Sequence, residues 1–137
     1  MKVLFDTNVL MDVFCRREPH YADSAQVVNL AVQGYIDALV PGHSIDTIHY
    51  LCMRFLDRDQ ADSIVDWLLA SFQISAATRE IYLRARSLYF ADFEDSVVAA
   101  MAEADSCDFI VTRNSSDFVL SPVIAVVPAE LLQDYSP

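Results

Sequence analysis

The stretch Val3-Leu4-Phe5-Asp6-Thr7-Asn8, near the start of a chain of 137 residues, decides the fold. Residues 2–5 form a short and almost uninterrupted apolar run, which is typical of a central strand in a parallel sheet. Thr7 is then a natural N-cap for a helix that carries Val9 and Leu10. Because Thr7 and Asn8 can satisfy the start of that helix, we expect Asp6 to point into a cleft at the end of the strand.

The rest of the chain alternates between apolar strands and amphipathic helices. Gly34 ends one helix as a C′ residue, and Pro128 opens the last one. Strands are expected at residues 2–5, 35–40, 72–75, 109–112 and 123–127. Helices are expected after Thr7 and at about 21–33, 44 or 46 to 56, 60–71, 77–89, 93–104 and 129–134. This alternation implies right-handed crossovers. We therefore predict an α/β fold, a three-layer α/β/α sandwich with a mainly parallel sheet, in which residues 1–137 form one domain.

Acidic residues stand at three points that such a sheet would bring together. Asp6 follows the first strand, Asp95 lies on the first turn of a helix, and Asp117 follows the 109–112 strand. Ligands of open α/β sheets bind outside the carboxyl ends of the strands. Carboxylates gathered there repel one another by about 4 kcal/mol per pair at about 4 Å and an effective dielectric of about 20. Because a cation relieves this repulsion and oxygen ligands favour Mg²⁺ or Mn²⁺, the pattern predicts a metal site and phosphodiester hydrolysis.

The segment Asp92-Phe93-Glu94-Asp95 opens a helix rich in small residues. Asp92 is expected to cap that helix, which leaves Asp95 for the metal. Glu94 is expected to face water. Helix capping without any ligand is the simpler alternative for a carboxylate on a first helical turn, because the helix dipole favours it there.

Polar residues beside the acids are candidates for supporting roles. Thr112 and Asn114 would hold the loop after their strand, and Arg113 between them would meet a phosphate. Asn8, on the first turn of its helix, would orient a neighbouring group through its amide. An Asx-rich turn with no ligand is the alternative for residues 112–117.

Composition limits the function. The chain has 20 acidic and 9 basic residues, a net charge of −11, and Lys2 as its single lysine. This composition argues against a broad basic face that grips nucleic acid, but not against a metal-centred nuclease, because the cation itself receives the phosphate. A basic partner could dock on the acidic surface. We find neither a signal peptide nor an apolar run of roughly 18 residues, and we expect a cytoplasmic protein with no membrane segment.

Two other kinds of site compete with the acidic one. His43, His49 and Cys52 suggest zinc, but a fourth ligand is not evident. A phosphoryl-accepting aspartate domain would need a lysine near the late-strand acid, and the chain has only Lys2. The cysteines lie far apart without a Cys-x-x-Cys pair, and we predict reduced thiols. They are Cys15, Cys52 and Cys107.

Four segments, taken in order, resemble the PIN domain. They are VLFDTNVLMD at 3–12, DFEDSVVAA at 92–100, IVTRNSSDF at 110–118 and PAELL at 128–132. The resemblance implies a Mg²⁺- or Mn²⁺-dependent ribonuclease, of a family that includes VapC-type toxins blocked by an antitoxin and commonly homodimeric. It also implies site roles, with Asp6, Asp95 and Asp117 as the acidic residues and with Thr7, Asn8, Thr112 and Asn114 in support.

The resemblance is incomplete at one position. PIN nucleases typically carry a glutamate early in the helix after the second strand, and Thr47 stands in its place here, next to Asp46. A step of one residue turns a helical side chain by about 100°, so Asp46 is not a simple substitute. A subgroup of PIN-like proteins also lacks this acid. Two functions follow, a ribonuclease with a three-acid site or a PIN-like interaction module with weak or no catalysis.

Overall fold

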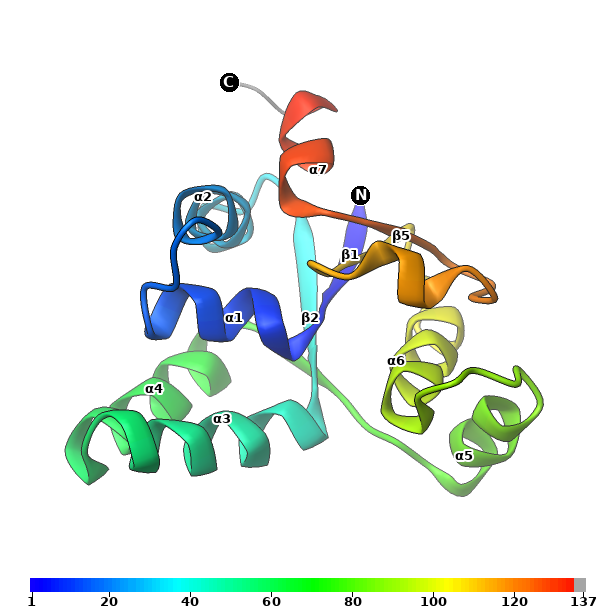
Figure 1. Ribbon diagram of the computed structural model, residues 1–137, viewed down its shortest axis with the longest axis horizontal. Coiled ribbons are helices and arrows are strands. Elements are labelled where there is room, and N and C mark those ends of the chain that lie inside the picture. Colours follow the sequence, from blue (N-terminus) through cyan, green and yellow to red (C-terminus); the bar gives the residue numbers. More distant parts are fainter. Residues whose placement is uncertain (135–137) are drawn as a thin grey trace.

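A computed structural model describes residues 1–134 and shows a twisted parallel sheet with helices around it (Figure 1). Within these residues the sheet has five strands in the order β3-β2-β1-β4-β5, and every pairing is parallel. The strands are β1 (Lys2–Phe5), β2 (Asp37–Pro41), β3 (Gln73–Ser75), β4 (Phe109–Val111) and β5 (Ile124–Val126). The predicted α/β class with a parallel sheet is thus confirmed.

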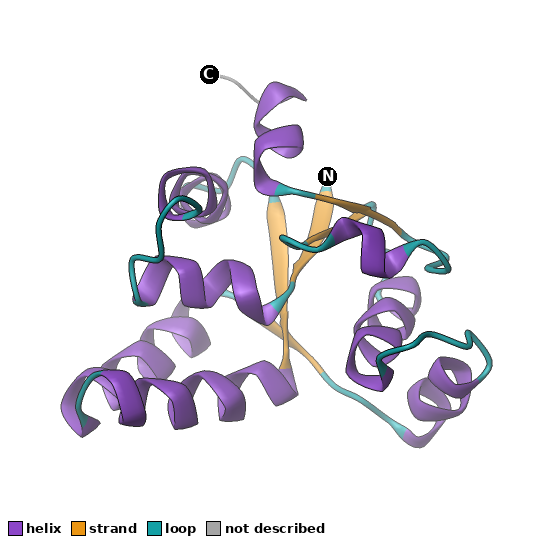
Figure 2. Ribbon diagram, in the orientation of Figure 1, coloured by secondary structure: helices purple, strands orange, loops and turns teal. Residues whose placement is uncertain are grey.

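Helices cover both faces of the sheet, which confirms the three predicted layers (Figure 2). Side chains alternate along β1, so Val3 and Phe5 pack on one face and Leu4 packs on the other. The first face is covered by α1 to α4 and α7, and the second by α5, α6 and the short helix η1. Their bounds are α1 (Thr7–Phe14), α2 (Tyr21–Val32), α3 (Gly42–Phe55), α4 (Arg58–Ser71), α5 (Arg79–Arg86), α6 (Phe93–Ala104), η1 (Ser115–Phe118) and α7 (Pro128–Asp134).

The central strand β1 brings distant segments together at the edge of the sheet that is formed by the carboxyl ends of its strands, which we call the carboxyl edge. It pairs with β2 on one side and with β4 on the other, where Phe5 lies opposite Val111. Because all strands run the same way, their carboxyl ends meet, and the Asp6 N–H donates to the Val111 carbonyl at 2.9 Å. Asp6 and Thr112 consequently lie next to each other although they are 106 residues apart.

The start of α3 differs from the expected one. The helix begins at Gly42, immediately after β2, rather than at a cap provided by Ser44 or Asp46. Pro41 is the N-cap, with an extended backbone and no side-chain hydrogen bond. Glycine fits at 42 because a Cβ there would lie only 3.3 Å from the Ser75 carbonyl oxygen of β3. The first residues of α3 are therefore held at the carboxyl edge of the sheet.

The end of α5 also differs, since the helix stops at Arg86 instead of continuing to residue 89. The Ser87 hydroxyl donates to the Arg84 carbonyl at 2.6 Å, which offers the backbone an alternative to the helix. The loop that follows holds Tyr89 at a φ of 58°, in the left-handed region. Gly34, by contrast, follows α2 at a φ of 83°, as expected for a C′ glycine.

Two further observations concern the part of the chain that the structure describes. None of its helices is both long and apolar enough to cross a membrane. The three cysteines are free thiols, as predicted, and Cys52 and Cys107 are buried.

Candidate active site

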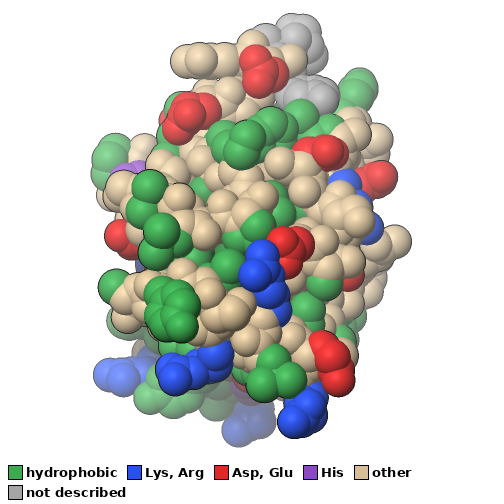
Figure 3. Space-filling view, turned by 90° about the vertical axis from the view of Figure 1, so that its right-hand side faces the viewer, with side chains coloured by type: hydrophobic (Ala, Val, Ile, Leu, Met, Phe, Trp, Pro, Cys, Tyr) green, Lys and Arg blue, Asp and Glu red, His purple; other side chains and the backbone are tan. Residues whose placement is uncertain are grey.

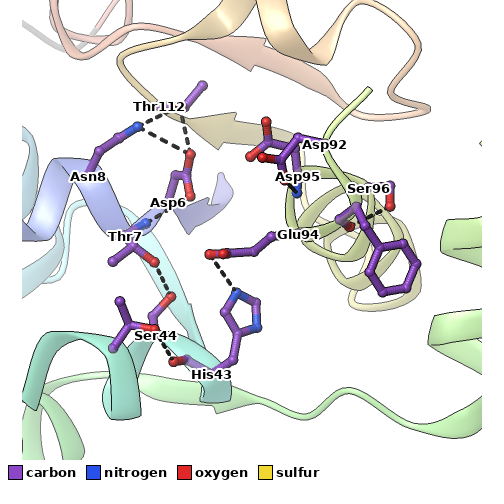
Figure 4. A network of polar contacts seen from close by, with 12 residues as sticks. Asp6, Thr7, Asn8, His43, Ser44, Asp92, Glu94, Asp95, Ser96 and Thr112 are labelled. Atoms are coloured by element: carbon purple, nitrogen blue, oxygen red, sulfur yellow. Dashed lines mark hydrogen bonds and ion pairs between the residues drawn. The ribbon is translucent and has the colours of Figure 1, made fainter. Parts of the chain in front are cut away.

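Asp6 is a buried carboxylate at the end of β1, held in place by hydrogen bonds (Figure 4). Its side chain caps α1, because its Oδ1 accepts from the Thr7 N–H at 2.9 Å. Its Oδ2 accepts from the Thr112 hydroxyl at 2.8 Å and lies 3.4 Å from Nδ2 of Asn8. The prediction that Thr7 would cap this helix in place of Asp6 was wrong, since the first N–H groups lie within reach of the preceding carboxylate. Asp6 nevertheless faces the cleft as well.

The loop after β4 supports Asp6. The Thr112 hydroxyl is fully buried and accepts from the Asn114 N–H at 3.2 Å while it donates to Asp6. Oδ1 of Asn8 accepts from the Arg113 N–H at 3.3 Å. The structure therefore places Asn8, Thr112 and Asn114 in one hydrogen-bond network around this carboxylate.

The Arg113 side chain is engaged elsewhere. Its Nε lies 3.1 Å from Oδ2 of Asp12, which is fully buried on α1, and the Ser24 hydroxyl donates to the same oxygen at 3.4 Å. Burial raises the pKa of Asp12, and the guanidinium opposes that rise. Arg113 was expected to meet a phosphate, but the structure shows it neutralising a carboxylate that folding removes from water.

The start of α6 places three carboxylates opposite Asp6. Asp92 is the N-cap, as predicted, and its Oδ1 accepts from the Asp95 N–H at 3.1 Å. Asp6, Asp92, Glu94 and Asp95 line one open hollow of about 240 Å³, which we call the acidic hollow (Figure 4). Two of the three predicted acids, Asp6 and Asp95, thus face the same space.

The carboxylates perturb one another. Burial and four neighbouring carboxylates raise the pKa of Asp95 to about 7. In decreasing order of effect these neighbours are Asp6, Asp92, Asp117 and Glu94. Burial also raises the pKa of Asp6, against the lowering effect of the hydrogen bonds that it accepts. Like charges and burial both disfavour the ionised form, so positive charge in the acidic hollow would be stabilising.

Asp117 lies on η1, beside a second and larger hollow of about 540 Å³. Asp92 and Asp95 line this hollow too. Asp95 therefore stands between Asp6 on one side and Asp117 on the other. The charge of Asp117 contributes to the raised pKa of Asp95, so these two carboxylates interact, although Asp117 does not line the acidic hollow that holds Asp6.

Glu94, which lines the acidic hollow, lies next to His43 (Figure 4). Glu94 is 57% exposed, in line with the expectation that it faces water, but its Oε1 lies 3.6 Å from Nε2 of His43. Nε2 is buried and makes no hydrogen bond within residues 1–134. His43 comes from the first turn of α3, so this contact joins α3 to α6 over the site.

The position of the missing glutamate is occupied by residues that do not replace it. The Thr47 hydroxyl donates to the His43 carbonyl at 3.1 Å, inside its own helix, and Asp46 is exposed. The α3 residue that contacts the Asp6 network is Ser44, whose Oγ lies 2.6 Å from Oγ1 of Thr7. The carboxylate of Glu94, on α6, is the one that reaches His43 in the first turn of α3, at 3.6 Å.

The donor set fits a hard divalent cation such as Mg²⁺ or Mn²⁺, because it consists of carboxylate oxygens. Among residues 1–134, no three His, Cys, Asp or Glu side chains converge closely enough to hold an ion jointly. Mg²⁺ commonly keeps several waters and binds through one or two carboxylates, so this spacing suits an ion held partly through water. The raised pKa values of Asp6 and Asp95 support the same fit.

The alternative sites find no support in the arrangement of their residues. His49 lies 2.8 Å from Oδ1 of Asp62, and Cys52 is fully buried in the core. Lys2 stands at the start of β1, at the opposite end of the strand from Asp6. A phosphoryl-accepting aspartate would need the lysine at the same end.

Three residues near the site, Arg17, His43 and Ser44, were missed by sequence reasoning, and Arg17 lines the acidic hollow itself. The signal that could have found His43 and Ser44 is Pro41-Gly42 directly after an apolar strand. A proline that ends a strand with extended backbone can start a helix without an intervening loop. In a parallel sheet the first turn of that helix then lies at the edge that carries Asp6.

The chain is similar to known proteins over most of its length. The family model described as PIN domain matches residues 2–116. Ribonuclease VapC1 of Aquifex aeolicus is 25% identical over 134 residues, a stretch that covers 94% of this chain and 91% of the relative.

Solved structures with a similar fold come from toxin–antitoxin systems. VapBC2 of Rickettsia felis, bound to a DNA fragment from its promoter, contains a chain with a TM-score of 0.72 and 16% identity, covering 93% of this chain and 98% of that one. A chain of a toxin–antitoxin complex from Klebsiella pneumoniae has a TM-score of 0.71 and 21% identity, covering 92% of this chain and 97% of that one. VapC20 of Mycobacterium tuberculosis, a sarcin–ricin loop cleaving toxin, has a TM-score of 0.65 and 10% identity, covering 79% of this chain and 86% of that one. At these identities the similarity supports the fold alone.

Proposed function

The chain belongs to the PIN domain family, and from this premise we propose that it is a ribonuclease that hydrolyses RNA phosphodiesters with Mg²⁺ or Mn²⁺. The observation that carries the proposal is the acidic hollow at the carboxyl edge of the sheet, where Asp6 and Asp95 face each other and the pKa of Asp95 is raised to about 7. Similarity to a relative named as a ribonuclease supports it.

The residues of the chain suggest how the work is divided. A divalent cation held by Asp6, Asp95 and Asp117, partly through water, would supply polarisation of the phosphate and an attacking water of lowered pKa. Asp6 is already fixed by its donors Thr7 and Thr112, so little reorganisation is needed on binding. Burial and the negative charge of neighbouring carboxylates raise the pKa of Asp95 to about 7 in the metal-free chain, and a cation bound there would neutralise that charge.

Glu94 supplies, in this proposal, the carboxylate that is missing at Thr47. It lines the acidic hollow, and its carboxylate reaches His43 at the start of α3. Its exposure leaves it able to change rotamer when a substrate or cation enters. The fourth acid would thus come from α6 rather than from α3.

We extend the proposal to the biological role: a toxin of a toxin–antitoxin pair, acting in the cytoplasm as a homodimer and blocked by a protein partner. The support is the fold shared with chains in solved toxin–antitoxin complexes. The net charge of −11 is consistent with a basic partner segment.

Cleavage of single-stranded RNA by the purified chain tests the nuclease proposal. Mn²⁺ should stimulate cleavage, and Asp6→Asn or Asp95→Asn should reduce the rate at least about 100-fold, because each removes a carboxylate from the reacting centre. Glu94→Gln should reduce the rate less and raise the Mn²⁺ concentration required. Asp66→Asn, on the exposed side of α4, makes the same chemical change away from the site and should leave the rate unaltered.

A second candidate function is a PIN-like interaction module without catalysis, and Thr47 in place of a glutamate favours it. The same experiment separates the two. If the wild type, Asp6→Asn and Asp95→Asn give equal cleavage in clean preparations, the nuclease proposal fails and the module is the better description.

A further inference from the structure

The larger hollow beside Asp95 is lined by two kinds of side chain, and each of its two segments, residues 89–95 and 116–120, supplies both kinds. Carboxylates come from Asp92, Asp95 and Asp117. Aromatic and aliphatic side chains come from Tyr89, Phe90, Val119 and Leu120. We call this space the aromatic hollow. Its volume of about 540 Å³ lies in the range of about 300–1,000 Å³ typical of ligand sites.

The side chain of Tyr89 is exposed, while the backbone on both sides of it is fixed by hydrogen bonds. Its side chain is 85% exposed, and its φ of 58° is unusual for an aromatic residue. On one side the chain is fixed by the end of α5 at Ser87, and on the other by the Asp92 cap of α6. The next ring, Phe90, packs edge-on against buried Phe118 with 5.8 Å between ring centroids. An unusual conformation maintained in this way is typical of functional loops.

The segment Tyr89-Phe90-Ala91 forms a ridge between the aromatic hollow and a further hollow of about 290 Å³. The second hollow is lined by Arg86 and by Phe93, and the Phe93 ring stacks on Tyr82 with 6.2 Å between centroids. The α5 and α6 side of the molecule shows hydrophobic side chains with a few basic and acidic ones between them (Figure 3). The basic side chain of Arg86 therefore lies on one side of the ridge, and the carboxylates that line the aromatic hollow lie on the other.

We propose that this ridge binds an unpaired RNA base next to the phosphate that is cleaved, with Tyr89 as the stacking platform; the inference rests on the proposed ribonuclease function. Unpaired bases stack on aromatic side chains, whereas bases in a duplex are not free to do so. The base would enter the aromatic hollow while its phosphate lies at Asp95, which lines the aromatic and the acidic hollow. Arg86, across the ridge, would meet a neighbouring phosphate.

Binding of a labelled oligoribonucleotide tests the ridge directly. Asp95→Asn protein serves as the parent, because it suppresses cleavage during the measurement. Adding Tyr89→Ala should weaken the affinity for single-stranded RNA by about 5- to 100-fold, the usual effect of losing one stacked base. Tyr89→Phe keeps the ring and should bind like the parent. Tyr35→Ala removes a tyrosine that is 65% exposed beside the other end of the sheet, and it should also bind like the parent.

Cleavage of RNA by the wild type with Mn²⁺ separates this inference from the proposed function. If Tyr89→Ala leaves RNA affinity unaltered while the wild type cleaves RNA, the base site is overturned and the ribonuclease proposal still stands. If the wild type does not cleave RNA while Tyr89→Ala still weakens RNA binding, the ribonuclease proposal fails and the base site holds.

Discussion

A carboxylate that folding buries needs hydrogen bonds or positive charge, and two aspartates in the described chain meet this need in different ways. Asp12 is paired with the Arg113 guanidinium at 3.1 Å. Asp6 instead accepts hydrogen bonds from neutral groups of Thr7 and Thr112, so its negative charge is not cancelled. The chemistry of the two residues therefore differs although both are buried, because only Asp6 remains able to attract a cation.

Arg113→Met should destabilise the fold. The change leaves the Asp12 charge buried without its partner, which typically costs about 3–5 kcal/mol in the free energy of unfolding. Urea denaturation near neutral pH measures this loss, and Arg54→Met, at an exposed position on α3, serves as the control. If Arg113→Met instead impairs RNA cleavage without loss of stability, the phosphate contact expected from the sequence is the correct role.

Elements whose ends are set by local chemistry were predictable. Helix α6 begins after Asp92 and spans the expected residues, because an aspartate N-cap acts on N–H groups of its own first turn. The start of α3 was not predictable in this way. It depends on Gly42 fitting against the Ser75 carbonyl of a neighbouring strand, which is a contact between segments more than thirty residues apart. The role of the Ser87 hydroxyl at the end of α5 is local, but it competes with a helical pattern that continues past it.

Asp92 both caps α6 and adds negative charge next to Asp95, and two substitutions separate these effects. Asp92→Asn keeps the cap, so stability should change little, but the pKa of Asp95 should fall from about 7 because one repulsive charge is lost. Asp92→Ala loses the cap as well and should cost about 1 kcal/mol. Carboxyl titration by NMR and urea unfolding provide the two measurements. An unchanged Asp95 titration in Asp92→Asn would mean that the two carboxylates do not interact.

The whole molecule explains why the acids meet. Parallel strands place their carboxyl ends at one edge, and this rule alone predicts that Asp6, Asp95 and Asp117 approach one another. The contact between Glu94 and His43 is different, because α3 and α6 cover opposite faces of the sheet and meet only at its edge. Nothing in the spacing of either helix specifies that meeting, so the fourth carboxylate could not be placed from the sequence.

Proton binding at the acidic hollow should make the stability of the metal-free protein depend on pH. The pKa of Asp95 is about 7 in the folded chain against an ordinary value of 3.8, so between these values the folded state holds a proton that the unfolded state has lost. Stability should therefore decrease as pH rises from about 4 to about 7. Asp6, whose pKa is also raised, contributes with the same sign. Thermal unfolding across this range should show the slope.

The slope of stability against pH should become smaller in Asp95→Asn, which has no proton to lose at residue 95, and should persist in Asp66→Asn.

Mn²⁺ binds the ionised carboxylates, so it should raise the midpoint of unfolding more at about pH 7.5 than at about pH 5, where protons compete with it. Each curve should show one cooperative transition, because residues 1–137 are predicted to form one domain. Two transitions would contradict that prediction, and an Mn²⁺ effect that is equal at both pH values would remove the acidic hollow as the place where the cation binds.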